Sequence, residues 1–165
     1  MLSRQELEAN NERFWTSFTD SQLASTPARK LLVLTCMDAR MDPLRMLGLR
    51  AGDAHIVRNA GGRVSDDAIR SLVISQQLLG TRHVVVMHHT KCGLLNVTND
   101  ELRQRLRPIL GHGVGGMDFL PLGADVMESV RKDVNSLRQH PLLAPDTVVQ
   151  GFVYDVATGR IAAVD

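Results

Sequence analysis

The chain has 165 residues, of which 44% are hydrophobic and 22% are charged, and its formal net charge is +1. This length suits a substantial core, and we expect residues 1–165 to form a single domain. The balanced charge does not favour a nucleic-acid-binding surface, and no apolar run approaches the ~20 residues that a membrane-spanning helix needs. We therefore expect neither nucleic acid nor a membrane as a partner.

The first residues are polar and acidic, so they resemble neither a secretory signal nor a transit peptide. A cytoplasmic location is the resulting expectation. The chain has two cysteines, Cys36 and Cys92. Because a structural disulfide is not expected in a reducing compartment, both thiols become candidates for metal binding or catalysis.

Hydrophobic periodicity predicts an amphipathic helix over residues 4–18, followed by alternating strands and helices. Apolar runs predict strands at 31–35, 55–58, 83–88, 147–155 and 160–164, the last two paired across a turn. Cap and stop residues predict further helices at 66–79, 98–110 and 125–139. This alternation predicts an α/β fold with a mostly parallel central sheet of four to five strands flanked by helices.

Three potential metal ligands follow two of these strands. Cys36 comes directly after the strand at 31–35, and His89 and Cys92 follow the strand at 83–88. If the two strands are neighbours in a parallel sheet, the three side chains converge at its carboxyl edge, where such folds bind ligands. Two thiolates and an imidazole are a usual ligand set for catalytic Zn²⁺, whereas a structural zinc usually fills four protein positions. The sequence therefore predicts a catalytic zinc site.

Asp38 and Arg40 lie two and four residues beyond Cys36. The guanidinium of Arg40 can hold the carboxylate of Asp38 through two hydrogen bonds. The carboxylate can then accept a hydrogen bond from a zinc-bound water, or it can fill the fourth zinc position itself and switch the site off. Both interpretations use the same residues, and both stay open.

The segment after the second predicted strand offers hydrogen-bond donors and two glycines. It fits a lining for a substrate pocket and its oxyanion, and it fits equally well a glycine turn that leads to the next helix. It lacks the glycine spacing and the Lys-Ser/Thr pair of a phosphate loop. Its residues are Arg58, Asn59, Ala60, Gly61 and Gly62.

Two further histidines are candidates for proton transfer. His88 is expected to point away from His89 if the strand continues, so a packed histidine is favoured over a proton shuttle. His112 lies in the glycine-rich segment 111–119, for which a loop is favoured over a lid.

In combination, these motifs resemble the β-class carbonic anhydrases. The resemblance implies Zn²⁺ bound by Cys36, His89 and Cys92, with Asp38 and Arg40 as the catalytic dyad. The segments that carry it are Cys-Met-Asp-Ala-Arg (36–40), Arg-Asn-Ala-Gly-Gly (58–62) and His-Thr-Lys-Cys-Gly (89–93).

The resemblance also implies an activity and an assembly. Zinc would lower the pKa of its bound water, and the resulting hydroxide would attack carbon dioxide to give bicarbonate. A homodimer or higher homo-oligomer is implied, with the helix in residues 1–18 packed on a partner copy and the active sites near the interface.

Two alternatives to carbon dioxide hydration remain. The amino-acid sequences of segments 53–62 and 88–93 resemble a compact branch of the family that also contains carbonyl sulfide and carbon disulfide hydrolases. Lys91 is an exception, because many relatives carry an acidic or a small residue at this position. The same zinc hydroxide would then act on carbonyl sulfide or carbon disulfide. A less favoured alternative is a non-catalytic zinc or redox-sensing module, in which Cys36 and Cys92 oxidise to a disulfide.

Overall fold

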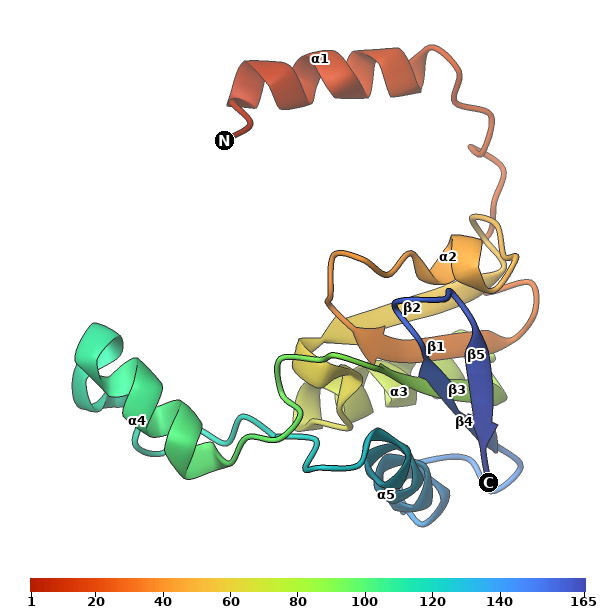
Figure 1. Ribbon diagram of the computed structural model, residues 1–165. Coiled ribbons are helices and arrows are strands. Elements are labelled where there is room, and N and C mark those ends of the chain that lie inside the picture. The colour runs from red at the N-terminus through yellow and green to blue at the C-terminus, as the bar shows by residue number, and fades with distance from the viewer.

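The computed structural model describes residues 1–165 and contains one five-stranded sheet of order β2-β1-β3-β4-β5 (Figure 1). The first four strands are parallel, and β5 pairs antiparallel with β4. The predicted α/β class and all five predicted strands are confirmed. The strands are β1 (Leu31–Cys36), β2 (Ala54–Asn59), β3 (His83–His89), β4 (Val148–Tyr154) and β5 (Ile161–Val164).

The four predicted helices occur in the predicted order. The structure adds three short helices, and the first helix is shorter at its carboxyl end than predicted. Ser65 and Thr98 cap α3 and α4 as predicted. The first helix ends before residue 18, because the hydroxyls of Thr16 and Ser17 bond carbonyls of the preceding turn. Sequence periodicity missed α2, η1 and η2, which are too short to show it. The helices are α1 (Arg4–Trp15), α2 (Pro43–Met46), η1 (Ala60–Gly62), α3 (Asp66–Gln77), α4 (Asn99–Leu110), η2 (Gly111–Val114) and α5 (Val126–Arg138).

The central strands are buried on both faces of the sheet, which explains their continuous apolar runs. On one face, residues such as Leu34 and Val86 pack against α3 and α5. On the other face, Val33 and Met87 pack with residues from α2 and from the loops that follow β1 and β3. Because β1 and β3 are neighbours at the centre, their carboxyl ends lie side by side within this core.

Helix α1 stands apart from the sheet, to which an extended connector joins it (Figure 1). None of its residues is buried. The side chains of Phe14 and Trp15 remain 59% and 65% exposed. None of the helices has the length and apolar character required to span a membrane.

Gly151 in β4 allows α5 to approach the sheet closely. A Cβ atom at this position would lie 2.5 Å from Cγ1 of Val130 and 3.0 Å from Cγ2 of Val134, both on α5. These distances are shorter than ordinary carbon contacts, so any larger residue must push the helix away.

We expect Gly151→Ala to lower the free energy of unfolding by about 1–3 kcal/mol, the usual cost of overpacking a core. The melting temperature, followed by circular dichroism, should fall by several degrees. Gly113→Ala is the matched control, because nothing lies within 4 Å of a Cβ atom there. An unchanged melting temperature for Gly151→Ala would show that α5 does not depend on this close approach.

Candidate metal centre

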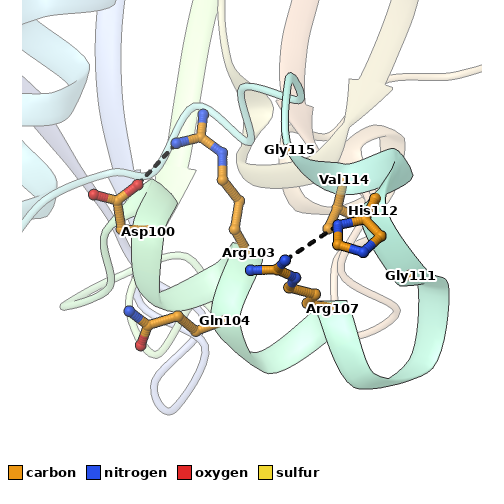
Figure 2. A pocket seen from close by; sticks show the side chains of 8 residues that line it. All are labelled: Asp100, Arg103, Gln104, Arg107, Gly111, His112, Val114 and Gly115. Atoms are coloured by element: carbon orange, nitrogen blue, oxygen red, sulfur yellow. Dashed lines mark hydrogen bonds and ion pairs between the residues drawn. The ribbon is translucent and has the colours of Figure 1, made fainter.

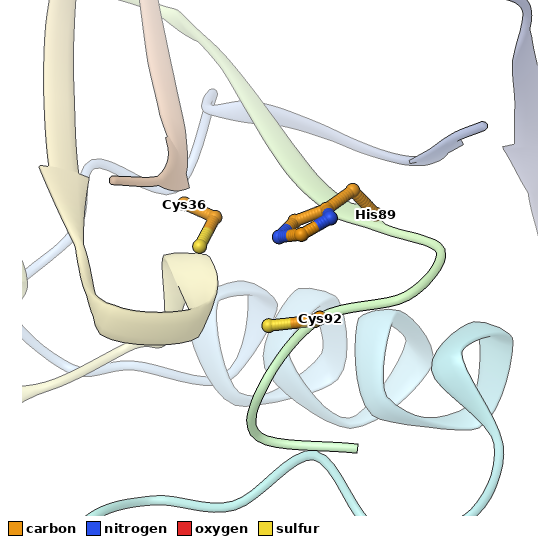
Figure 3. Close-up of side chains that lie close together, drawn as sticks. All are labelled: Cys36, His89 and Cys92. Atoms are coloured by element: carbon orange, nitrogen blue, oxygen red, sulfur yellow. The ribbon is translucent and has the colours of Figure 1, made fainter. Parts of the chain in front are cut away.

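Cys36, His89 and Cys92 converge at the carboxyl edge of the sheet, and their side chains point toward one another (Figure 3). The two sulfur atoms and the nearest ring nitrogen all lie within 4.8 Å of one another. Cys36 is the last residue of β1 and His89 is the last residue of β3, so both strands run one residue further than predicted. All three residues are buried.

The imidazole of His89 is fixed in one orientation. Its Nδ1 lies 2.8 Å from the carbonyl oxygen of Thr90, which can only accept, so Nδ1 carries the proton. Nε2 therefore keeps its lone pair in the neutral ring. This Nε2 is buried and has no hydrogen-bond partner. A buried acceptor without a partner, held by a hydrogen bond at the opposite nitrogen, is the usual state of a metal-ligating histidine.

The surroundings of the two thiols favour a negative charge between them. The neighbouring Cys92 thiol, together with His89 and the backbone of Asp38 and Gly61, lowers the pKa of Cys36 despite its burial. The proximity of Cys36, with burial, raises the pKa of Cys92, so Cys36 is the thiol that ionises first. The thiolate is the form that binds metals, so the site is prepared for a cation.

The donor set fits a zinc ion. Two cysteine sulfurs and one imidazole nitrogen match the soft and borderline ligands that zinc prefers, and the lone pair of His89 Nε2 has no other use. Three protein donors would leave a four-coordinate zinc with one position free for water or substrate, and a hollow lies next to Cys36 and Cys92. Such an arrangement is typical of catalytic rather than structural zinc sites.

Asp38 and Arg40 form the predicted pair beside these ligands. Nε and one terminal nitrogen of Arg40 donate to the two carboxylate oxygens of Asp38 at 2.8 and 2.7 Å, and the Arg40 backbone N–H donates at 2.9 Å. These bonds hold the pKa of Asp38 well below its usual range. Oδ2 of Asp38 lies 3.7 Å from Nε2 of His89. The carboxylate is therefore ionised and adjacent to the candidate metal ligands.

The guanidinium of Arg40 is itself oriented by the loop that carries Cys92. It donates to the carbonyl oxygen of Lys91 at 3.1 Å. Lys91 has a φ of 55°, in the left-handed region. The Asp38–Arg40 pair is thus tied to the turn between His89 and Cys92.

The hollow in front of these residues has a volume of about 720 Å³ and a mainly apolar lining. Side chains of Met37, Ala39 and Leu94 contribute to this lining. The residues that line it are Cys36, Met37, Asp38, Ala39, Arg40, Ala60, Gly61, Cys92, Gly93 and Leu94. A small uncharged molecule would find both an apolar wall and the polar Asp38–Arg40 pair there.

The segment expected to line the substrate pocket does so only in part. Ala60 and Gly61 line the hollow, whereas the side chain of Arg58 donates to the backbone carbonyls of Cys36 and Asp38 at 3.0 and 2.8 Å. Asn59 bonds the backbone of Arg63. The first two residues of this segment therefore support the backbone near the ligands.

Gly62 is the point where this segment touches the end of β1. Its φ is +70°, and a Cβ atom would lie 2.8 Å from the backbone nitrogen of Cys36. Only glycine permits both this backbone angle and this approach.

The two histidines that were considered for proton transfer, His88 and His112, lie outside the candidate metal centre. His88 is fully buried and points to Asp133 on α5, at 3.3 Å, which agrees with the expected packed side chain. His112 lines a separate hollow of about 350 Å³ between α4 and η2 (Figure 2). There Arg107 donates to His112, and Arg103 is bonded to Asp100 and to the carbonyl of Met117. Apart from His112, none of the residues predicted to belong to the site lines that hollow.

Several residues near the centre were not identified from the sequence. Met37 and Ala39 occupy the two variable positions of the Cys-x-Asp-x-Arg motif, and these positions carry no signal of their own. They line the hollow because Cys36, Asp38 and Arg40 on either side of them do. Leu94 carried no comparable signal, because an isolated leucine in a loop is most often a packing residue. Arg63 and Asp133 lie 70 residues apart, and nothing in their local sequence indicates that they pair.

A model of the family described as carbonic anhydrase matches residues 31–114, the region that contains all the candidate ligands. Beta-carbonic anhydrase 1 of Mycobacterium tuberculosis is 40% identical over 154 residues, which cover 93% of this chain and 92% of that protein. A carbon disulfide hydrolase of Acidithiobacillus thiooxidans is 36% identical over 157 residues, which cover 82% of this chain and 72% of that protein.

The fold has close counterparts among solved structures. A carbonic anhydrase from Streptococcus mutans superimposes with a TM-score of 0.91 at 44% sequence identity. The superposition covers 100% of this chain and 99% of that chain, so it includes α1 and the protruding α4 as well as the sheet.

We expect Arg40→Gln to raise the pKa of Asp38 toward the ordinary value of about 3.9, because the cation that stabilises the carboxylate is lost. In the unaltered protein, the stabilisation is complete above the unfolded pKa and is lost as the pH falls through the lower folded value. The carboxyl ¹³C shift of Asp38, followed by NMR during acid titration, measures the midpoint. An equal midpoint in both proteins would mean that Arg40 does not control the ionisation of Asp38.

Proposed function

Because the chain belongs to the β-carbonic anhydrase family, we propose that it catalyses the zinc-dependent hydration of carbon dioxide to bicarbonate. One observation carries this proposal: Cys36, His89 and Cys92 converge within 4.8 Å beside an ionised Asp38 that Arg40 holds through both oxygens. These five residues supply a metal site, a hydrogen-bond acceptor and a mainly apolar hollow in one place.

Zinc held by Cys36, His89 and Cys92 would supply a Lewis acid that makes a water molecule nucleophilic near neutral pH. The role of Asp38 follows from its position and charge. Its Oδ2 lies 3.7 Å from His89 Nε2, close enough to the ligands to accept a hydrogen bond from the attacking water. That bond would leave the water with a lone pair directed at the carbon of carbon dioxide.

The low pKa of Asp38 assigns it an orienting role rather than that of a general base. A carboxylate that Arg40 stabilises so strongly does not retain a proton near pH 7. Attack forms one carbon–oxygen bond, and the electron pair of one carbon–oxygen π bond moves to oxygen. Bicarbonate results, and one proton leaves to solvent through the mouth of the hollow.

The Asp38–Arg40 pair also favours an open site, that is, one in which Asp38 does not bind the metal and the fourth position stays free for water. For Asp38 to become a fourth metal ligand, it would have to weaken its bonds to Arg40, which measure 2.7 to 2.9 Å. Charge-assisted hydrogen bonds of this length are the strong class. We propose that the carboxylate accepts a hydrogen bond from water in the resting enzyme.

Hydrolysis of carbon disulfide or carbonyl sulfide is the second candidate function. The mainly apolar lining of the hollow, with Met37 and Leu94, suits sulfur, which is larger and less polar than oxygen. The similarity to a protein named carbon disulfide hydrolase supports this alternative. The same metal ligands and the same Asp38–Arg40 pair would serve either substrate.

The deciding experiment compares three substrates with one zinc-loaded preparation. Carbon dioxide hydration is measured by stopped flow with a pH indicator, and carbonyl sulfide and carbon disulfide by sulfide release. We expect carbon dioxide to be the fastest substrate. Fast sulfide release with weak hydration would instead assign the enzyme to the second function.

Variants test the roles of the residues in the same assays. Cys92→Ala should lose bound zinc, measured by metal analysis, because two donors no longer retain the ion. Asp38→Asn should keep zinc and lose turnover by about 10²- to 10³-fold, the usual cost of removing one positioned hydrogen-bonding group from an active site. Asp67→Asn is the matched control, since Asp67 forms an Asp–Arg pair with Arg70 on the exposed face of α3. Full zinc and activity in Cys92→Ala would refute the assigned site.

We further propose that residues 1–165 form one domain that assembles as a cytoplasmic homodimer or higher homo-oligomer. Helix α1 would pack on a second copy through Leu7 and Phe14, which share one of its faces at helical spacing. Phe18, just beyond the helix, would join them, because its ring centroid lies 5.6 Å from that of Phe14 and all three side chains are exposed. Both cysteines are free thiols, which suits a reducing compartment.

We expect Phe14→Glu to dissociate the assembly, because a charge would replace a buried aromatic side chain at the interface. Sedimentation velocity at several protein concentrations measures the mass. Ala9→Glu is the control, since helical spacing places Ala9 on the opposite face of α1. Equal masses for Phe14→Glu and the unaltered protein would show that this face of α1 does not form the contact.

A further inference from the structure

Arg63 is a nearly buried cation that lies outside the hollow and follows the glycine turn at 60–62. Its side chain is 14% exposed and forms an ion pair of 2.9 Å with Asp133 on α5, which is 6% exposed. A second terminal nitrogen donates to the carbonyl of Pro121 at 3.0 Å and to the hydroxyl of Ser129 at 2.9 Å. One guanidinium therefore joins three segments of the chain: the turn at 60–62 that precedes Arg63, the segment at Pro121, and helix α5.

The first segment leads to Cys36. The side chain of Asn59 closes the turn by accepting from the N–H of Arg63 at 2.8 Å and donating to its carbonyl at 2.7 Å. Within this turn, Gly61 lines the same hollow as Cys36. A Cβ atom on Gly62 would lie 2.8 Å from the backbone nitrogen of Cys36, so the turn is packed against that residue and a shift of the turn must move the surroundings of the Cys36 sulfur.

The second segment leads to Cys92. Beyond Pro121, the chain pairs with the loop that follows Cys92: the N–H of Leu122 donates to the carbonyl of Leu94 at 2.9 Å. The next residue, Leu95, donates its N–H to the carbonyl of Cys92 at 3.1 Å. The bond from Arg63 to the Pro121 carbonyl thus fixes the strand-like segment against which the Cys92 loop is held.

The third segment leads to His89. Asp133, the partner of Arg63, also accepts from the N–H of Val64 at 3.2 Å and lies 3.3 Å from Nε2 of His88. His88 is fully buried and directly precedes His89 on β3. The ion pair therefore contacts the strand end from which His89 projects.

We propose that Arg63, with Asp133, is a positioning residue that holds the backbone around all three candidate metal ligands in place. This inference rests on the proposed metal site. Arg63 touches neither the ligands nor the hollow, so its effect must pass through the turn at 60–62, the segment at 121–123 and His88. Residues that orient metal ligands in this way commonly change metal affinity when they are replaced.

The test uses Cd²⁺ as the probe, because thiolate–cadmium charge transfer gives an ultraviolet absorption that reports on the ligands. We expect Arg63→Gln to bind Cd²⁺ about 10- to 100-fold more weakly than the unaltered chain, and to shift or weaken the absorption. Titration followed by absorption measures both quantities. A role in stability alone would not change the absorption of the saturated protein.

Arg82→Gln is the matched control. Arg82 likewise pairs with an aspartate, Asp146, at 3.2 Å and donates to the backbone carbonyls of Gln76 and Thr81. It precedes β3 and so lies at the end of that strand opposite to His89. We expect its Cd²⁺ affinity and absorption to equal those of the unaltered protein.

Arg63→Lys keeps a cation for Asp133 but lacks the second terminal nitrogen that reaches Pro121 and Ser129, so it guards against a failure of Arg63→Gln to fold. We expect a folded protein by circular dichroism, with weaker Cd²⁺ binding. Affinity and absorption equal to those of the unaltered chain in this variant would overturn the inference, as would equal losses in Arg63→Gln and Arg82→Gln. If the unaltered chain itself binds neither Cd²⁺ nor Zn²⁺, the proposed function fails as well.

Discussion

The metal centre depends on the parallel pairing of β1 with β3. In parallel strands the carboxyl ends meet at one edge, so the residues that end these two neighbouring strands, Cys36 and His89, lie close together there, just beyond the last pair, Thr35 and Met87. Cys92 is brought in by a turn of two residues after His89. A strand inserted between β1 and β3 would separate the thiol from the imidazole, and an antiparallel β3 would place them at opposite ends of the sheet.

The negative charges near this edge of the sheet are each balanced by a nearby donor or cation, so they can lie in or beside the core. The backbone near Cys36 and Cys92 acts to lower the pKa of both thiols, so it stabilises negative charge there without adding a further titratable group. Asp38 is neutralised by Arg40 on the solvent side, and Asp133 is neutralised by Arg63 on the buried side. The exposed pair lines the hollow, whereas the buried pair supports the scaffold. An unpaired buried charge is costly. Removal of one partner from the buried Arg63–Asp133 pair would therefore lower the stability of the fold more than removal of one partner from the exposed Asp38–Arg40 pair.

The fold and the convergence of the three candidate ligands could be predicted from the sequence because both depend on local signals. Apolar runs marked each strand, and Cys36, His89 and Cys92 stood at their ends. The limits of the prediction are also physical. Helix α1 has an apolar face but nothing to bury it within the chain, so periodicity could not give its end or its packing. The link between Arg63 and Asp133 forms only in three dimensions, and no spacing along the chain indicates it.

The order of the strands has a kinetic consequence. Strand β3 must pair with β4, which lies nearly sixty residues further along the chain, and Arg63 must wait for α5 before it finds its carboxylate. Contacts between residues so distant in sequence form slowly, because the loop-closure entropy is lost before the contacts compensate for it. The contacts of Arg63 with α5 are among these distant ones, so they carry this entropic cost. A metal ion would find the complete set of donors only in a chain in which β1 and β3 are already paired.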